Sequence, residues 1–99
     1  MKVHFTTAAV EQLDGIYAYI AKDSVKYAQQ VIDRIIEKAN NVAMFPQGAA
    51  IVPEYSRHDV REVFAYHYRI IYLILPKQID VLAVVHGAKP LPPKVEDLS

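Results

Sequence analysis

Hydrophobic residues in the first half of the chain recur every three or four positions, after one short alternating stretch. The alternation over residues 2–6 predicts a strand. Helical stripes follow at Val10, Leu13, Ile16, Tyr17, Ile20 and Ala21, and at Ala28, Val31, Ile32, Ile35, Ile36, Ala39, Val42 and Ala43. Thr6 or Thr7 can cap the first helix, and Asp23-Ser24 interrupts the pattern and can cap the second. Because so few residues separate the two stripes, we expect an antiparallel helix hairpin.

The hydrophobic period changes after Pro46, which cannot continue a helix. Residues 47–58 contain Gly48 and Pro53 and are expected to form a loop. Hydrophobic runs joined by short connections then cover residues 60–66, 68–75 and 79–85. This spacing predicts an antiparallel meander, with the second run, apolar on both faces, as its central strand. The expected fold is α+β, in the order β-α-α-β-β-β.

The last residues, 87–99, contain three prolines and end in a polar stretch. We expect an extended tail on a single domain that spans residues 1–99, weakly ordered unless a partner holds it. Its prolines argue against a further strand, and its polar end argues against a place in the core. We therefore expect the tail to supply part of a surface for binding a target.

Composition narrows the classes of protein to consider. The 99 residues include no cysteine, which excludes a disulfide scaffold, a cysteine zinc site and a thiol nucleophile. Eleven Lys and Arg balance eleven Asp and Glu, whereas proteins that live on nucleic-acid phosphates carry an excess of cations. No apolar run is long enough to cross a membrane, and no signal sequence is apparent. We expect a cytoplasmic protein that does not contact membranes.

Tyrosine is unusually frequent, with seven residues in so short a chain and no tryptophan. Several phenol rings must therefore lie at the rim of the core, where their hydroxyl groups need partners or water. Such a surface suits a protein that buries area against another protein.

The order of elements and several short motifs together resemble the RelE/ParE toxin superfamily of type II toxin–antitoxin modules, and its ParE branch most closely. The motifs are Tyr19-Ile20-Ala21, Phe45-Pro46-Gln47-Gly48, Val60-Arg61-Glu62-Val63, Tyr68-Arg69-Ile70-Ile71-Tyr72 and Val84-Val85-His86-Gly87-Ala88-Lys89. One departure lies in the loop after the helices. The family often has Gly-Arg there, but Ala49 and Ala50 follow Gly48 in this chain.

Four residues are candidates for target binding: Arg61, Arg69, His86 and Lys89. Two arginines on a sheet can hold phosphate oxygens or an acidic surface with paired hydrogen bonds. The alternative is structural, with both arginines forming cross-strand ion pairs to Glu62 and Asp59. His86 has a similar alternative as a strand-end residue bonded to backbone. The face of each arginine depends on the length of the turn near Tyr66-His67.

A ribonuclease of the RelE type remains an alternative. Cleavage of RNA through its 2′-hydroxyl needs a base, an acid and cations around the phosphate. Arg61, Arg69, His86 and Lys89 would supply these groups. However, the position where the resemblance implies a second basic residue is Val63, and no tyrosine follows Lys89. The cluster is therefore incomplete, and we favour a non-catalytic protein.

The resemblance implies a toxin that inhibits DNA gyrase and is neutralised by a cognate antitoxin. A third possibility is a degenerate member that binds the antitoxin without being toxic. We expect no cofactor and no metal site, because the four histidines are scattered and lack ligand spacing. We also expect no sequence-specific nucleic-acid binding by the chain alone. A homodimer and a toxin–antitoxin heterotetramer are both compatible with the sequence.

Overall fold

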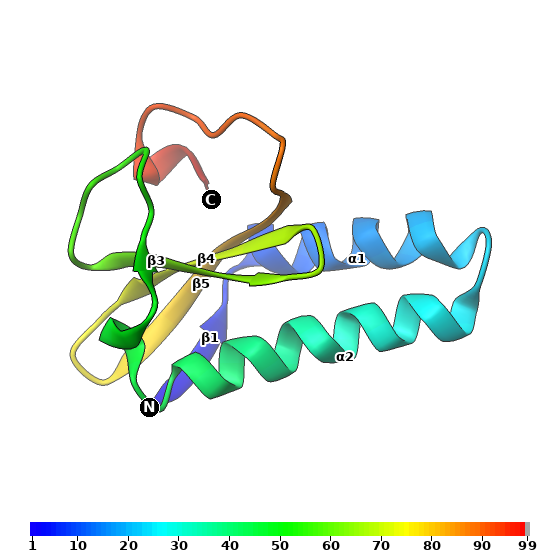
Figure 1. Cartoon of the computed structure of the whole chain (residues 1–99), viewed down its shortest axis with the longest axis horizontal. Coiled ribbons are helices and arrows are strands. Elements are labelled where there is room, and N and C mark those ends of the chain that lie inside the picture. Colours follow the sequence, from blue (N-terminus) through cyan, green and yellow to red (C-terminus); the bar gives the residue numbers. More distant parts are fainter. Residues whose placement is uncertain (99) are drawn as a thin grey trace.

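A five-stranded mixed sheet forms the centre of the molecule in the computed structural model, which describes residues 1–98 (Figure 1). The strands are β1 (Lys2–Phe5), β2 (Ala50–Ile51), β3 (Val60–Ala65), β4 (Tyr68–Ile74) and β5 (Gln78–His86). They lie in the order β1-β5-β4-β3-β2, with β1 parallel to β5 and the other neighbours antiparallel. The predicted α+β fold and the central place of β4 are confirmed. The loop expected over residues 47–58 is wrong at β2, which pairs with the outer side of β3.

Two antiparallel helices, α1 (Thr7–Ala21) and α2 (Val25–Val42), connect β1 to the rest of the sheet. The side chain of Thr6 accepts a hydrogen bond from the Ala9 N–H at 3.2 Å, and Ser24 accepts one from the Tyr27 N–H at 3.0 Å. Each bond satisfies a backbone donor that the first turn of a helix would otherwise leave unpaired. These caps set the start of each helix, so the predicted hairpin is confirmed.

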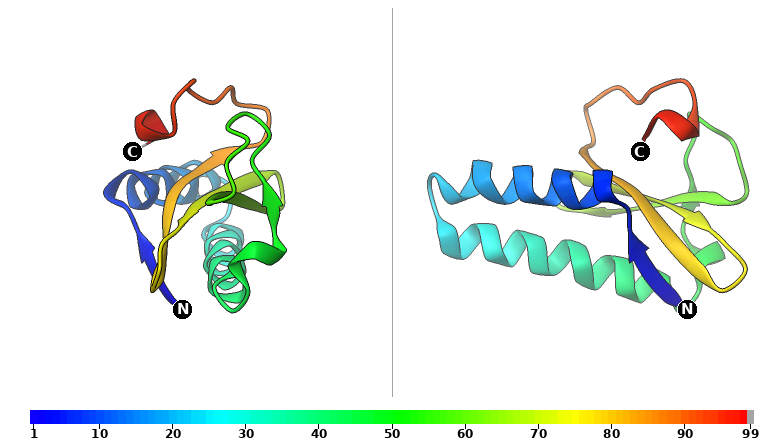
Figure 2. Two further views of the ribbon diagram at one scale, coloured as in Figure 1. Left: turned by 90° about the vertical axis from the view of Figure 1, so that its left-hand side faces the viewer. Right: turned by 180° about the vertical axis from the view of Figure 1, so that it is seen from behind.

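The helices cover one face of the sheet, with α1 against β5 and α2 against β3 (Figure 2). The largest side chains that are fully buried on this face come from α2, β4 and β5: Val31, Ile35, Ile70, Tyr72, Ile79, Val81 and Val84. Val10, predicted to lie on the apolar stripe of the first helix, is instead 44% exposed. The buried residues of α1 are Ala9 and Leu13. The main core is therefore built chiefly by α2 against the two central strands.

Residues 87–98 arch over the opposite face of the sheet (Figures 1 and 2). They end in a short 3-10 helix, η2 (Val95–Leu98), whose Leu98 is only 8% exposed. Leu98 packs in a second hydrophobic cluster with Val52, Val60, Ile71, Leu82, Ala83 and Val85. The prediction that the end of the tail is too polar to join a core is therefore wrong, because Leu98 is buried in the second cluster and Leu91 and Val95 pack against it.

The turn between β3 and β4 settles which way the arginine side chains point. Ala65 pairs with Tyr68, so Tyr66 and His67 form a two-residue turn. Arg61 then lies opposite Tyr72, which belongs to the core under the helices. Arg69 lies opposite Val85, which belongs to the second cluster. The two arginines therefore point to opposite faces of the sheet.

No helix among residues 1–98 is long and apolar enough to cross a membrane.

Candidate functional site

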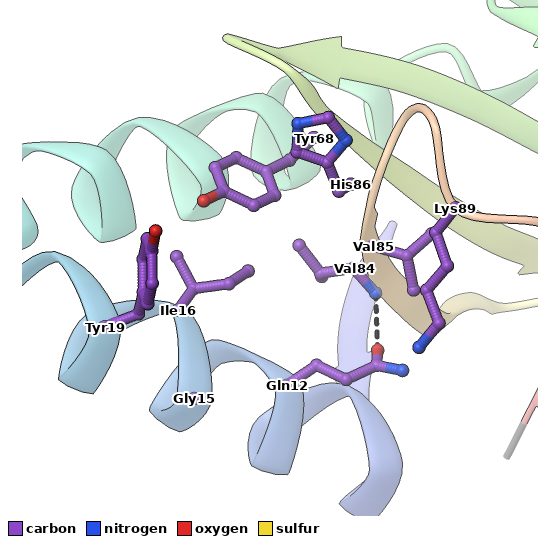
Figure 3. Close-up of a pocket in the computed structure, with 9 residues that line it drawn as sticks. All are labelled: Gln12, Gly15, Ile16, Tyr19, Tyr68, Val84, Val85, His86 and Lys89. Carbon is purple, nitrogen blue, oxygen red and sulfur yellow. Dashed lines mark hydrogen bonds between the residues drawn. The ribbon is translucent and has the colours of Figure 1, made fainter.

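A surface groove runs between α1 and the end of β5 (Figure 3). It has a volume of about 440 Å³, and we call it the α1–β5 groove. Its lining residues are Gln12, Gly15, Ile16, Tyr19, Tyr68, Val84, Val85, His86 and Lys89. Ile16 and Val84 form an apolar floor, Tyr19 and Tyr68 stand at one end, and Gln12 and Lys89 lie together at the other. Gly15 leaves the helix side open, since nothing would contact a Cβ atom there within 4 Å.

The groove brings together two of the four predicted target-binding residues, His86 and Lys89. Both side chains are exposed. The Nδ1 atom of His86 accepts a hydrogen bond from the Ala88 N–H at 3.1 Å, and the Lys89 N–H donates to the His86 carbonyl at 3.0 Å. The backbone-bonded alternative predicted for His86 is therefore present, while the rest of its ring remains accessible. Since Nδ1 is the acceptor, a neutral His86 carries its proton on Nε2.

Gln12 lines the groove and supplies a hydrogen-bond acceptor to the edge of β5 where no neighbouring strand does so. β1 pairs with β5 only as far as Val81, so the following part of β5 has no neighbour on that side. There the Val84 N–H donates to Oε1 of Gln12 at 2.7 Å. A side-chain amide thus satisfies a backbone donor that would otherwise be left unpaired. The sequence offered one signal for this role, because Gln12 is a polar residue placed between Ala9 and Ile16 on the inner side of α1.

Arg61 lies away from the groove and fastens the loop that follows α2. Its guanidinium group donates to the carbonyl groups of His58 at 2.9 Å, Gln47 at 3.0 Å and Ala49 at 2.9 Å. Neither the predicted ion pair to Glu62 nor that to Asp59 is formed by Arg61. Its remaining surface lines a smaller hollow of about 310 Å³ with His58 and Asp59. Arg61 is thus half-buried and committed to backbone contacts.

Tyr72 holds the same loop from the neighbouring strand. Its hydroxyl group donates to the Pro46 carbonyl at 2.8 Å, and the whole side chain is buried. Burial raises the pKa of Tyr72 to about 12, because the phenolate would be poorly solvated there. The residue is therefore a structural donor and not an acid for catalysis near neutral pH.

Arg69 forms an ion network on the face covered by the tail. Its guanidinium group donates from Nε to Glu62 at 2.6 Å and from both terminal nitrogens to Glu54, at 2.7 and 2.9 Å. The side chains of Arg69 and Glu62 are only 8% and 7% exposed. Hydrogen bonds from Arg69 lower the pKa of Glu54 to about 2, and the same bonds raise the pKa of Arg69. The predicted pairing with Glu62 is present, but the second partner is Glu54 in place of Asp59, which pairs with Arg57.

The four predicted residues therefore occupy three separate places. His86 and Lys89 share the α1–β5 groove, Arg61 ties down a loop, and Arg69 is enclosed by two carboxylates. Within residues 1–98, no group of three or more His, Cys, Asp or Glu side chains is arranged to hold a metal ion. The groove offers a cation, an imidazole, an amide and aromatic rings, which suit binding.

Comparison with known proteins identifies the family of the chain. The family described as ParE toxin of type II toxin–antitoxin system, parDE, matches residues 3–91. A solved structure described as the chromosomal ParDE TA system from P. aeruginosa superposes with a TM-score of 0.71. It covers 87% of this chain and 95% of that chain at 20% identity, which shows a shared fold. A search among curated proteins gave no match. The chain belongs to the ParE toxin family of type II toxin–antitoxin systems.

Proposed function

We propose that this protein is an active toxin that binds DNA gyrase after the enzyme has cut DNA and holds it in that state. It acts as a binding module and not as a catalyst. The observation that carries this choice is the engagement of both strand arginines. Arg61 donates to three backbone carbonyls and Arg69 to two carboxylates, and the two side chains point to opposite faces of the sheet, so the two guanidinium groups do not converge on one phosphate. A ribonuclease would need such cations to converge on one phosphate with an acid and a base.

Enzyme assays with the purified protein test this proposal. We expect the protein to inhibit supercoiling by gyrase and to increase the amount of cleaved DNA, while mRNA on ribosomes stays intact. Lys89→Ala should weaken inhibition, because Lys89 is an exposed cation of the groove. Lys77→Ala is the matched control, since Lys77 is equally exposed but lies in the turn between β4 and β5.

Two results would contradict the proposal. Cleavage of mRNA with unaffected gyrase would make the protein a ribosome-dependent ribonuclease and would assign Arg61, Arg69, His86 and Lys89 to catalysis. A protein that affects neither target but still binds an antitoxin would be a degenerate member of the family.

We propose in addition that a cognate antitoxin covers exposed apolar side chains of the helix hairpin. Large apolar residues of α1 and α2 remain exposed, including Tyr19 at 71%, Val25 at 61% and Val10 at 44%. Such surface favours a partner segment that folds as it docks. Co-expression with the adjacent gene should restore growth and raise the yield of soluble protein. An isolated chain that is abundant, harmless and without a partner in pull-down experiments would contradict this.

A further inference from the structure

Several aromatic rings gather around the turn between β3 and β4 and the end of β5. Tyr27 contacts Tyr66 edge to face, with ring centroids 6.3 Å apart. His67 follows Tyr66 in the turn and stacks on His86 at 6.1 Å. His86 in turn contacts Tyr68 edge to face at 6.1 Å, and Tyr68 lines the α1–β5 groove together with Tyr19. The aromatic row therefore consists of Tyr19, Tyr27, Tyr66, His67, Tyr68 and His86, and it includes four of the seven tyrosines.

Most of the row lies at the surface, whereas Tyr68 is half-buried and packs against the main core. Tyr19, Tyr27 and Tyr66 are 71%, 47% and 51% exposed, and both histidines are exposed as well. Rings that leave about half or more of their surface in solvent gain only part of the free energy of burial, so their concentration at one place suggests a role beyond folding.

The backbone conformation of Tyr66 is a second, independent indication that this surface has a role beyond folding. Tyr66 has a φ of 55° and is the first residue of the two-residue turn between β3 and β4. Turns with a positive φ at this position favour glycine, because a side chain there crowds the backbone. A bulky, exposed tyrosine adds strain without filling the core. Strained positions of this kind are concentrated at functional sites.

Two cations lie beside the row. The ammonium group of Lys22 lies over the Tyr19 ring at 5.8 Å from its centroid, and Lys89 lines the groove. None of the described residues that line the groove carries a carboxylate. The amide of Gln12 faces the same space, and because its Oε1 atom accepts from the Val84 N–H, its NH2 group remains as a donor. The surface thus combines flat rings, flexible cations and one amide.

We propose that the aromatic row and the α1–β5 groove bind single-stranded nucleic acid, without dependence on sequence. Bases would stack on the exposed rings, and phosphates would lie near Lys22 and Lys89, which is how single strands are held by proteins without base-specific contacts. The groove volume of about 440 Å³ has room for one nucleotide. A protein partner would be an alternative reason for exposed tyrosines, but the flanking cations and the lack of carboxylates favour an anionic ligand. Weak binding is expected, because few cations contribute and the chain as a whole has zero net charge.

Fluorescence anisotropy with labelled oligonucleotides of about eight nucleotides tests the proposal, using the full chain at low salt. Single-stranded DNA should bind more tightly than the duplex of the same sequence. Tyr19→Leu and Tyr66→Gly should each weaken binding by about tenfold through loss of stacking. Tyr66→Gly should at the same time raise the melting temperature, because glycine relieves the strained turn. Lys89→Ala should weaken binding and reduce its dependence on salt.

Phe45→Leu is the matched control. Phe45 is 69% exposed and follows the far end of α2, so its loss should leave the affinity unchanged. Three results would each overturn the proposal: no binding of single strands by the folded protein up to about 1 mM, equal binding by the Tyr19 and Tyr66 variants, or displacement of the oligonucleotide by an equal concentration of inorganic phosphate. A further overturning result is a duplex that binds as well as the single strand, because stacking would then not be the cause. The test needs no gyrase, so its outcome is separate from that of the proposed toxin activity.

Discussion

Arg61 and Arg69 lie on adjacent strands and differ in what surrounds their guanidinium groups. Arg61 is half-buried and donates to peptide carbonyls, which water could partly replace. Arg69 is enclosed and balances Glu62, a carboxylate that water scarcely reaches. Loss of Arg69 would leave that carboxylate buried and unpaired, whereas loss of Arg61 would leave only neutral acceptors. The energetic cost of removing each arginine should therefore differ strongly.

Arg69→Ala should lower the free energy of unfolding by about 3–5 kcal/mol, the range for breaking a buried ion pair. Arg61→Ala should cost less, about 1–3 kcal/mol, because its three hydrogen bonds go to neutral carbonyl groups that water can partly reach. Urea denaturation measures both. The double variant Arg69→Met with Glu62→Leu should recover most of the loss, because neither charge is then left unpaired. Equal costs for the two single variants would show that the network around Arg69 adds nothing to stability.

Ionisation of the Glu54 carboxyl group should make the free energy of unfolding depend on pH in the acidic range. Its pKa in the folded protein is about 2, against an ordinary value of 4.5, so the folded state holds the proton less firmly than the unfolded state. The contribution of Glu54 is therefore complete above about pH 4.5 and is lost as the pH falls towards 2. The effect should be modest, because the Glu54 side chain is 41% exposed. Comparison with Glu54→Gln across this range should show the difference in unfolding free energy shrinking with acid, and a constant difference would contradict the assignment.

At the scale of elements, local pattern predicted most of the fold. The helical stripes, the Ser24 cap and the alternating strands depend on neighbouring residues, and each was recovered from the sequence. β2 and the tail were missed, because both are held by partners far along the chain. Ala50 pairs with Glu62, and Leu98 packs on strands far before it in the sequence. The hydrophobic pattern of a short stretch of sequence does not indicate such long-range contacts.

The tail should behave as a structural strap. Leu98→Ala should cost about 2 kcal/mol or more, because a nearly buried leucine is replaced by a smaller side chain. Lys94→Ala is the matched control on an exposed residue of the same segment and should stay within about 0.5 kcal/mol. Thermal unfolding followed by circular dichroism gives both values. A Leu98 variant as stable as the Lys94 variant would restore the view of the tail as a free terminus.

At the scale of the whole molecule, β4 joins the two hydrophobic clusters. Ile70 points under the helices and Ile71 points under the tail, and both are fully buried. A β-bulge in β5 shifts the register between Ile71 and Tyr72, with Ile71 opposite Ala83 and Tyr72 opposite Val81. The two clusters share strands and should therefore lose their packing together.

We expect a single cooperative unfolding transition. Near-ultraviolet and far-ultraviolet circular dichroism should report the same midpoint in urea, both for the natural chain and for Ile71→Ala. Ile71→Ala should lower the unfolding free energy by about 2–5 kcal/mol through the cavity that it leaves. An early loss of the tyrosine signal with intact secondary structure would show that the face under the tail unfolds separately.

The candidate site was harder to predict than the fold. His86 and Lys89 could be grouped because they are close in sequence and follow the same strand. Arg61 and Arg69 looked equivalent, and only the two-residue turn at Tyr66 and His67 decides that they face opposite sides. Glu54 could not be identified as a partner, because its loop has no periodic pattern. The faces of the two arginines and the pairing of Glu54 could not be predicted, because they depend on the geometry of a turn and a loop.

The pairing of β1 with β5 has a consequence for the timing of synthesis. Residues at the very start of the chain find their strand partners only after residue 78, and the second cluster closes only with Leu98. A ribosome still holding the C-terminal residues would keep both the last strand and the strap from docking. The chain should therefore complete its fold only after Leu98 has emerged from the ribosome, and nascent chains stalled before residue 78 has emerged should lack the pairing of β1 with β5.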